Sequence, residues 1–450
     1  MQIDVSQRAG CSPVSCCIHN TGCRAASNAL VKDRREAICS EIDEVMETTM
    51  SEGQRPLEGI RVIEMGQLLA GPFTGTILSY FGAEVIKVEP PTGDPIRGWR
   101  MLDEGGTSFW WRSLGRNKKS VTLDLKSERG QQLAKELIKT ADVVVENFRP
   151  GLMEKWGIGP EDMKVENPGL VYARISGYGQ DGPYAVKPGY ASVTEGFGGF
   201  RYINGEPGQP PIRTNISMGD TLSAIHAALG IALAIIQRSK PGGKGQVIDV
   251  ALYESIFNLM EGIVPEYDGG GAIRQPSGTT VTGIVPTNTY LCDDGKHVVI
   301  GGNGDSIFKR LMVVAGRSDM AENPEMADNA GRVIHQEEID QALSDWCAAH
   351  SSSHVIAVLE EARVPVGPIY SVEDMVQDEH YNARGMFESV EINGEPLKIP
   401  AILPKMSDTP GRTDWPGGEI GSHNDEILKG ILQLSDEDIA HLQSDGVVGS

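Results

Sequence analysis

Residues 60–89, "IRVIEMGQLLAGPFTGTILSYFGAEVIKVE", determine the fold of this chain. The stretch opens with a short β-branched run at 60–65 and continues with small residues at helical spacing over 68–82. It closes with a second β-branched run at 83–89. A strand, a helix and a strand in close succession predict a βαβ unit, whose two strands run parallel.

The alternation continues through the first half of the chain. Further strands are expected in "KSVTLDL", "DVVVENF" and "GLVYARIS", with helices in "SERGQQLAKELIKTA" and near "GLMEKWG". A long helix is expected over about 221–238, followed by one more strand and helix in "VIDVALYESIFNLMEGIV". This order predicts an α/β fold with a doubly wound, Rossmann-like parallel sheet.

The composition changes near residue 265, where Gly, Thr and Pro become frequent. Two alternating strands, "TYLCDD" and "KHVVIGG", then predict a smaller α+β domain with helices at about 306–315, 336–350 and 354–362. We therefore expect four parts. They are an N-terminal extension at 1–50, a large domain at 51–264, a small domain at 265–395, and a C-terminal segment at 396–450 that returns to the large domain.

The net charge of the chain limits the classes of molecule that it is expected to bind. The chain has 62 acidic and 40 basic side chains and a formal net charge of -22, which opposes nonspecific attraction to nucleic acid or anionic lipid. No run of about 18 apolar residues is evident, so no membrane-spanning segment is expected. The sequence is typical of an acidic enzyme of the cytoplasm, or of mitochondria in a eukaryote.

Five of the seven cysteines lie within the first 40 residues, so the rest of the chain is not a disulfide scaffold. The segment "CSPVSCCIHNTGC" lacks two clean CxxC pairs, and both a disordered tail and a metal site remain open for it. Met50 begins "MSEGQRPLEG", which is typical of a natural start. Residues 1–49 are therefore expected to lie outside the fold.

Two candidate nucleotide-binding motifs are excluded by the residues that follow them. "GYGQDG" at 177–182 satisfies GxGxxG, but prolines follow it and no helix is expected to open there. "GQLLAGP" has no Lys-Ser or Lys-Thr after its second glycine, which excludes a Walker A loop. No HExxH or GxSxG motif occurs, and no metal site is predicted in the body of the chain.

Asp220 stands between a glycine and an apolar helix in "SMGDTLSAIHAALGI", residues 217–231. Aspartate is among the best N-cap residues, because its carboxylate accepts hydrogen bonds from the first turn. The same position keeps a carboxylate ionised, since a helix N-terminus favours an anion. A structural cap and a catalytic carboxylate are both compatible with this stretch.

Six ordered motifs resemble one family from about residue 57 to near the C-terminus. They are "PLEGIRVIEMGQLLAGP", "GAEVIKVEPPTGDPIRGW", "NKKSVTLDLK", "DVVVENFRPG", "NPGLVYARISGYGQDGP" and "SMGDTLSAIHAALGI". Their order and spacing are similar to those of the class III CoA-transferases, the CaiB–BaiF family that includes formyl-CoA transferase. The segment before Met50 is not covered.

The resemblance implies that Asp220 is the nucleophile and that a coenzyme A thioester is a substrate, with no permanently bound cofactor. It also implies a homodimer of interlinked, ring-shaped subunits that acts on an acyl-CoA and a carboxylic acid. The implied CoA-binding positions are Leu69, Arg97, Leu123, Lys126, Asn147, Phe148 and Lys155. The stretch "VTGIVPTN" at 281–288 matches a mobile glycine loop, although it holds only Gly283.

The sequence departs from the family pattern at Ala191, where the racemases of the family carry an acidic residue. Glu195, four residues on, either contacts substrate or is an ordinary structural or solvent-facing residue. Similarity to dicarboxylate-using members suggests succinyl-CoA as donor and glutarate, hydroxymethylglutarate or itaconate as acceptor, with Arg174 and Arg213 as candidate carboxylate partners. The alternatives are an α-methylacyl-CoA racemase and a noncatalytic acyl-CoA-binding subunit.

Overall fold

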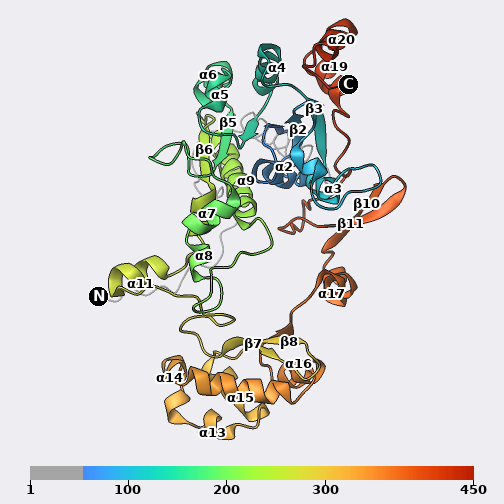
Figure 1. Cartoon of the computed structure of the whole chain (residues 1–450). Helices are drawn as coiled ribbons and strands as arrows, with labels where there is room; N and C mark the ends of the chain where they lie inside the picture. The colour runs from blue at the N-terminus through green and yellow to red at the C-terminus, as the bar shows by residue number, and fades with distance from the viewer. Residues whose placement is uncertain (1–53, 450) are drawn as a thin grey trace, which may run out of the picture. The chain divides into compact units, whose positions relative to one another are not determined.

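The computed structural model describes residues 54–449 (Figure 1). The expectations for residues 1–49, including the five N-terminal cysteines and the start at Met50, fall outside the described residues.

A six-stranded parallel sheet is built from the strands of the first half of the chain, in the order β3-β2-β1-β4-β5-β6. In the register of the sheet, Val62 pairs with Val85 on one side and with Val143 on the other. The predicted parallel α/β sheet is confirmed. The strands are β1 (Arg61–Glu64), β2 (Glu84–Glu89), β3 (Lys118–Thr122), β4 (Val143–Glu146), β5 (Val171–Ser176) and β6 (Val247–Ala251).

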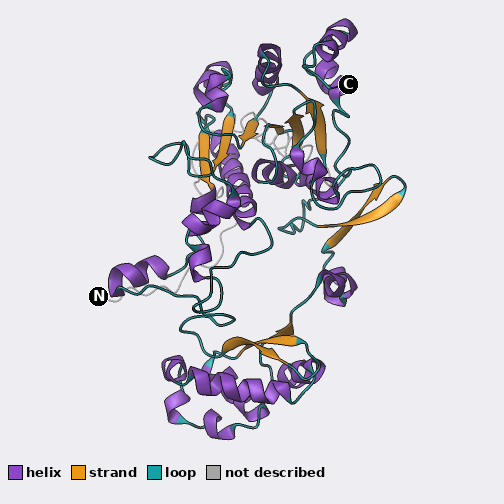
Figure 2. Cartoon of the chain, in the orientation of Figure 1, coloured by secondary structure: helices purple, strands orange, loops and turns teal. Residues whose placement is uncertain are grey.

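Helices cover both faces of this sheet (Figure 2). Neighbouring residues of β1 supply opposite cores, Val62 to one face and Ile63 to the other, because successive side chains of a strand alternate. The Val62 face carries α2 (Ala70–Tyr80) and α9 (Met218–Arg238). The Ile63 face carries α4 (Glu128–Lys139), α5 (Leu152–Lys155), α6 (Pro160–Glu166), α19 (Asn424–Gly430) and α20 (Asp436–Ser444).

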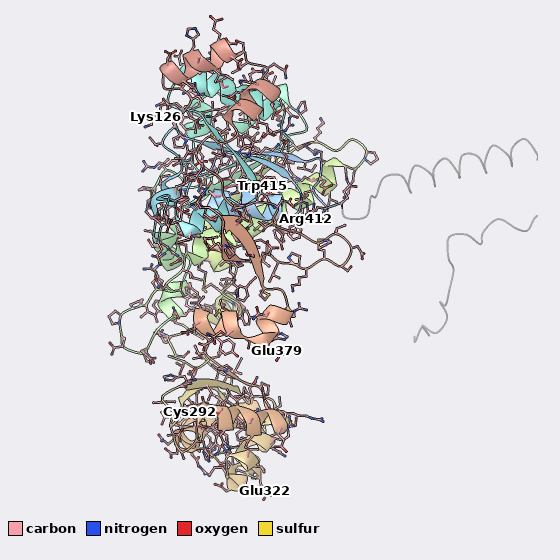
Figure 3. The ribbon with its side chains drawn as sticks, turned by 90° about the vertical axis from the view of Figure 1, so that its right-hand side faces the viewer. Lys126, Cys292, Glu322, Glu379, Arg412 and Trp415 are labelled. Atoms are coloured by element: carbon pink, nitrogen blue, oxygen red, sulfur yellow. The ribbon has the colours of Figure 1, made fainter. Side chains whose placement is uncertain are left out.

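The C-terminal segment packs against the sheet, as Figure 3 shows for Arg412 and Trp415. The indole nitrogen of Trp415 donates to the Lys118 carbonyl at 3.3 Å. The Asn424 side chain accepts from the Thr122 backbone N–H at 2.8 Å. These contacts join residues about 300 positions apart and extend the large sheet unit with chain from the far end of the sequence.

A second hydrophobic core is made by residues 285–364 alone. A three-stranded sheet, β7-β8-β9, lies over helices α12 to α16, and the predicted strand pair is its β7–β8 ladder. The elements are β7 (Thr287–Leu291), β8 (His297–Gly301), α12 (Asp305–Val314), α13 (Ser318–Ala321), η2 (Pro324–Met326), α14 (Asn329–Ile334), α15 (Gln336–Ala348), α16 (Ser352–Glu361) and β9 (Val366–Pro368).

Several elements were not expected from the sequence. One of them, α11 (Ile263–Gly270), spans the predicted domain boundary at 264 and ends where Gly271 adopts a φ of 68°. The others are η1 (Pro95–Gly98), α3 (Phe109–Leu114), α7 (Ala191–Phe197), α8 (Phe200–Ile203), α17 (Val372–Gln377), α18 (Glu379–Ala383) and the hairpin β10 (Phe387–Ile392) and β11 (Glu395–Pro400). The predicted helix near 252–264 is the shorter α10 (Leu252–Phe257).

The helix α9 bears on the expectation that no segment spans a membrane. Among residues 54–449, this helix is long and apolar enough to cross a membrane by length and composition alone. One face of α9, however, packs in the core beside the sheet through Ala227, Ile231 and Ala234. A core helix passes the same test, so α9 is weak evidence for a span.

Candidate active site

The strand order of the sheet reverses between β1 and β4. In doubly wound sheets the ligand-binding crevice lies at such a switch point, outside the carboxyl ends of the strands. The Asn147 side chain bridges it, accepting from Gln67 N and donating to Gln67 O, both at 2.8 Å. Gly66 and Gly71 permit this approach, since a β-carbon on Gly66 would stand 2.9 Å from Gly71 Cα.

Three of the predicted CoA-binding residues meet at this switch point. Leu69 precedes α2, whose N-terminus opens beside the crevice, while Asn147 and Phe148 follow β4. The Phe148 ring contacts Trp156 edge to face, with the ring centres 5.3 Å apart, so the loop after β4 is held against α5. Lys155 is the last residue of α5 and its side chain is exposed.

Leu123 and Lys126 follow β3, two strands away from β1 on the same edge of the sheet. Leu123 is fully buried in the core and its backbone N–H donates to Glu89 O at 2.8 Å, which argues against a direct contact with CoA. Lys126 is exposed and labelled in Figure 3. The structure therefore leaves the two predicted lysines, Lys126 and Lys155, as accessible cations on that edge.

Arg97 is placed differently from the prediction. Its Nε and Nη2 donate to the two carboxylate oxygens of Glu89 at 2.7 Å each, and its Nη1 donates to the Gly418 carbonyl at 2.8 Å. The guanidinium also stacks 3.8 Å above the Trp111 ring. Because the side chain is buried and engaged by protein, Arg97 acts as an internal ion pair, which argues against a direct contact with CoA.

Asp220 lies toward the same edge of the sheet as the crevice. The last residue of α9, Arg238, donates to Asp142 Oδ1 at 2.9 Å and to Gly169 O at 3.1 Å, and those residues precede β4 and β5. The C-terminus of α9 is therefore at the amino ends of the strands. The N-terminus of α9, with Asp220 in its first turn, points to the carboxyl ends.

The cap interpretation of Asp220 is not supported. The helix begins at Met218, its N-cap is Ser217, and the Asp220 carboxylate makes no hydrogen bond to any other described residue. Burial and the nearby carboxylate of Glu195 raise the pKa of Asp220 to about 6, against the opposing effect of Arg213. At neutral pH this side chain is an ionised, largely desolvated and unpaired carboxylate, which is the state that a nucleophile requires.

Glu195, for which the sequence left a substrate contact and a structural or solvent-facing role open, is buried beside Asp220. It is 1% exposed on α7, and its Oε1 lies 3.5 Å from the Gly219 backbone nitrogen, one residue before Asp220. Ala191, one turn earlier on α7, is also buried and faces Gly219. The i, i+4 spacing of these two residues was the available signal, since it puts both on one helix face.

The two arginines predicted as carboxylate partners lie in different environments. Arg174 on β5 is bound by Glu146 at 2.8 Å and by Glu154 at 2.6 Å, so its guanidinium is occupied inside the protein. Arg213 lies in the loop before α9, and its Nε is 3.3 Å from Glu195. Of the two, only Arg213 belongs to the surroundings of Asp220.

The predicted glycine loop at 281–288 is anchored on α14. The Asn329 side chain donates to Gly283 O at 2.8 Å and accepts from Val285 N at 3.1 Å. Gly283 has a φ of 77°, and a β-carbon there would meet nothing within 4 Å. The preceding Gly278 donates to Gly205 O at 3.0 Å, which joins this segment to the loop that carries Arg213.

Comparison with known proteins defines the family. The model of "CoA-transferase family III" matches residues 57–424. A succinyl-CoA–D-citramalate CoA-transferase of Chloroflexus aurantiacus is 44% identical over 397 residues, covering 88% of this chain and 98% of the relative. A succinate–glutarate CoA-transferase of Agrobacterium fabrum is 34% identical, covering 85% and 97%.

Among solved structures, a CAIB/BAIF family protein from Brucella suis superposes with a TM-score of 0.74 at 31% identity, covering 85% of this chain and 100% of that one. The chain belongs to CoA-transferase family III. It is accordingly a class III CoA-transferase, and coenzyme A thioesters are its substrates.

Proposed function

We propose that the protein transfers CoA from succinyl-CoA to a small dicarboxylic acid through covalent intermediates on Asp220. One observation carries the proposal. Asp220 is an unpaired carboxylate of raised pKa in the first turn of a core helix, and that turn points toward the ligand-binding edge of the sheet.

The proposed route has four acyl transfers. The Asp220 carboxylate attacks the thioester carbonyl of succinyl-CoA, giving a mixed anhydride and CoA thiolate. The thiolate attacks the aspartyl carbonyl, which releases succinate and leaves an aspartyl-CoA thioester. The acceptor carboxylate then displaces the thiolate to form a second anhydride, and the thiolate takes the acceptor's acyl group, which regenerates Asp220.

In this proposal the switch-point crevice between β1 and β4 receives CoA. Asn147 and the loop at Gln67 line it, and Lys126 and Lys155 supply point charges for the phosphates. The loop at 281–288 would close over the acyl group, with α14 as its fixed base. Backbone N–H groups of such a loop are the donors expected to stabilise each tetrahedral oxyanion.

The acceptor is proposed from the printed names of the relatives, citramalate and glutarate, which are both dicarboxylic acids. The racemase alternative needs an acid or base where this chain has the buried methyl group of Ala191. The alternative of a noncatalytic subunit is disfavoured by the retained Asp220 and its unpaired geometry.

The test of the covalent route is mass spectrometry of the protein mixed with succinyl-CoA and hydroxylamine. Hydroxylamine converts an activated carboxylate to a hydroxamate, so the Asp220 peptide should become about 15 Da heavier. The same peptide should stay unmodified without succinyl-CoA and in Asp220→Asn. Absence of the adduct with every acyl-CoA donor, together with α-proton exchange in deuterated water, would instead support the isomerase.

We also propose that two copies of the chain associate. Ile225, Leu229, Leu233 and Ile236 form an exposed apolar stripe along α9, on the side away from the sheet. An apolar patch of this kind marks an interaction surface. Light scattering should give twice the mass of one chain, and Leu229→Glu with Leu233→Glu should shift it to one chain. A monomeric wild-type protein at micromolar concentration would contradict this prediction.

A further inference from the structure

A buried glutamate, Glu195, holds two arginines beside Asp220. Its Oε2 lies 3.3 Å from Arg213 Nε and 3.6 Å from Arg201 Nη2. Its Oε1 faces the Gly219 backbone nitrogen at 3.5 Å. Because the glutamate is 1% exposed, it gives the two guanidiniums a fixed anchor instead of a surface contact.

The two arginines keep hydrogen-bond donors unused. Arg213 faces Glu195 with its Nε, its side chain is 42% exposed, and its terminal NH₂ groups meet no acceptor among the described residues. Arg201, on α8, has a buried Nε with no hydrogen-bond partner in the described part of the chain. A guanidinium with a free edge is suited to a second carboxylate, which it binds through two parallel N–H···O bonds.

The charges of this cluster change during the proposed reaction. Two arginines balance Glu195 and Asp220 in the resting protein. When Asp220 becomes an anhydride or a thioester, it loses its negative charge and the cluster carries a net charge of about +1. An anionic group that arrives at that stage restores the neutrality of the cluster, and the guanidinium of Arg213 is exposed enough for it to reach.

We propose that Arg213 and Arg201, positioned by Glu195, bind the carboxylate that does not react, first of the succinyl donor and then of the acceptor. This inference rests on the proposed transfer through Asp220 and gives its substrate class. The donor acyl group and the acceptor both derive from dicarboxylic acids, and the site selects them over monocarboxylic analogues of the same length. Arg213 and Arg201 touch the substrate, whereas Glu195 is a positioning residue.

The first test compares Arg213→Gln with wild type on two matched substrate pairs. Glutarate and succinyl-CoA carry the second carboxylate, while pentanoate and butyryl-CoA carry a methyl group in its place. Arg213→Gln should lower kcat/KM for the dicarboxylate pair about 10- to 100-fold and leave the monocarboxylate pair nearly unchanged. Arg317→Gln removes the same charge beside α13 and should change neither. An equal loss on both pairs would overturn the assignment.

A binding measurement does not depend on turnover. Asp220→Asn reproduces the charge of the acylated protein, so calorimetry should show tighter glutarate binding to it than to wild type. Adding Arg213→Gln should abolish that binding, and pentanoate should bind neither protein. Glutarate binding that ignores Arg213 would overturn the inference even if transfer is confirmed. Arg213-dependent binding without transfer in wild type would sustain the carboxylate site and reject the proposed function.

Discussion

Replacing Asp220 with asparagine is expected to lower kcat of CoA transfer by at least about 10⁴-fold, because none of the other residues between 54 and 449 offers a carboxylate in that position. Asparagine has nearly the same shape as aspartate, so the first turn of α9 should keep its conformation. CoA binding at the β1–β4 switch point should therefore survive. The measurement is steady-state transfer from succinyl-CoA together with calorimetric titration of CoA.

The same substitution should stabilise the fold at neutral pH. The pKa of Asp220 rises from 3.8 to about 6 in the folded protein, so folding favours its protonated form. That contribution to stability is present below pH 3.8 and is lost as the pH rises through 6. At pH 8 the ionised carboxylate costs about 1 to 2 kcal/mol, after allowance for its partial exposure, and asparagine removes that cost.

Urea unfolding at pH 4 and pH 8 separates this effect from general repacking. The free energy of unfolding of Asp220→Asn should exceed that of wild type at pH 8, and the difference should shrink toward zero at pH 4. A variant that loses activity and is equally destabilised at both pH values would show that Asp220 is a structural residue. Retained transfer activity would remove Asp220 from the mechanism.

The parallel sheet was predictable because its strands are buried on both faces and therefore appear as continuous β-branched runs. The runs at 83–89 and 142–148 became β2 and β4. The helix α11 was missed because "YDGGG" has no helical periodicity and is rich in glycine. Motif order located Asp220, but whether its carboxylate capped the helix depended on where α9 begins.

The surroundings of Asp220 could not be predicted from the sequence for a different reason. Arg97 was expected to bind CoA, yet Glu89, eight residues earlier, accepts hydrogen bonds from its Nε and Nη2, and Gly418 O accepts from its Nη1. Glu195 on α7 meets Arg201 on α8 and Arg213 in the loop before α9, and α7 packs on both helices. Such pairings depend on tertiary packing, which leaves no period in the sequence.

Glu64→Gln is expected to give the largest loss of stability, about 3 to 5 kcal/mol. Glu64 is fully buried on β1, with Oε1 2.9 Å from Lys87 Nζ and Oε2 2.8 Å from Lys118 Nζ. Lys87 has a second carboxylate, Asp94 Oδ2 at 3.0 Å, whereas Glu64 is the only carboxylate that the described chain places on Lys118. Removing the charge of Glu64 therefore leaves one buried ammonium uncompensated.

The pKa of Lys118 reflects the cost of burying its charge. Desolvation lowers it to about 8 even though Glu64 raises it, so its charged form depends on that carboxylate. In Glu64→Gln we expect Lys118 to be neutral in the folded protein at pH 7. Folding then requires loss of a proton, and the destabilisation should grow as the pH falls from 8 to 6.

The matched control is Glu84→Gln on the neighbouring strand, which pairs with Arg61 and Lys119 at 2.7 Å each in a half-exposed setting. Glu84→Gln should lower the free energy of unfolding by less than about 1 kcal/mol.

The buried network also holds the loop that lines the crevice, because Lys87 donates to Gly66 O at 2.7 Å and Asp94 accepts from Leu68 N at 3.1 Å. Glu64→Gln should accordingly weaken CoA binding as well as stability, while Glu84→Gln leaves CoA binding intact. Equal effects of the two substitutions on unfolding in urea and on CoA titration would show that burial of this network contributes nothing specific.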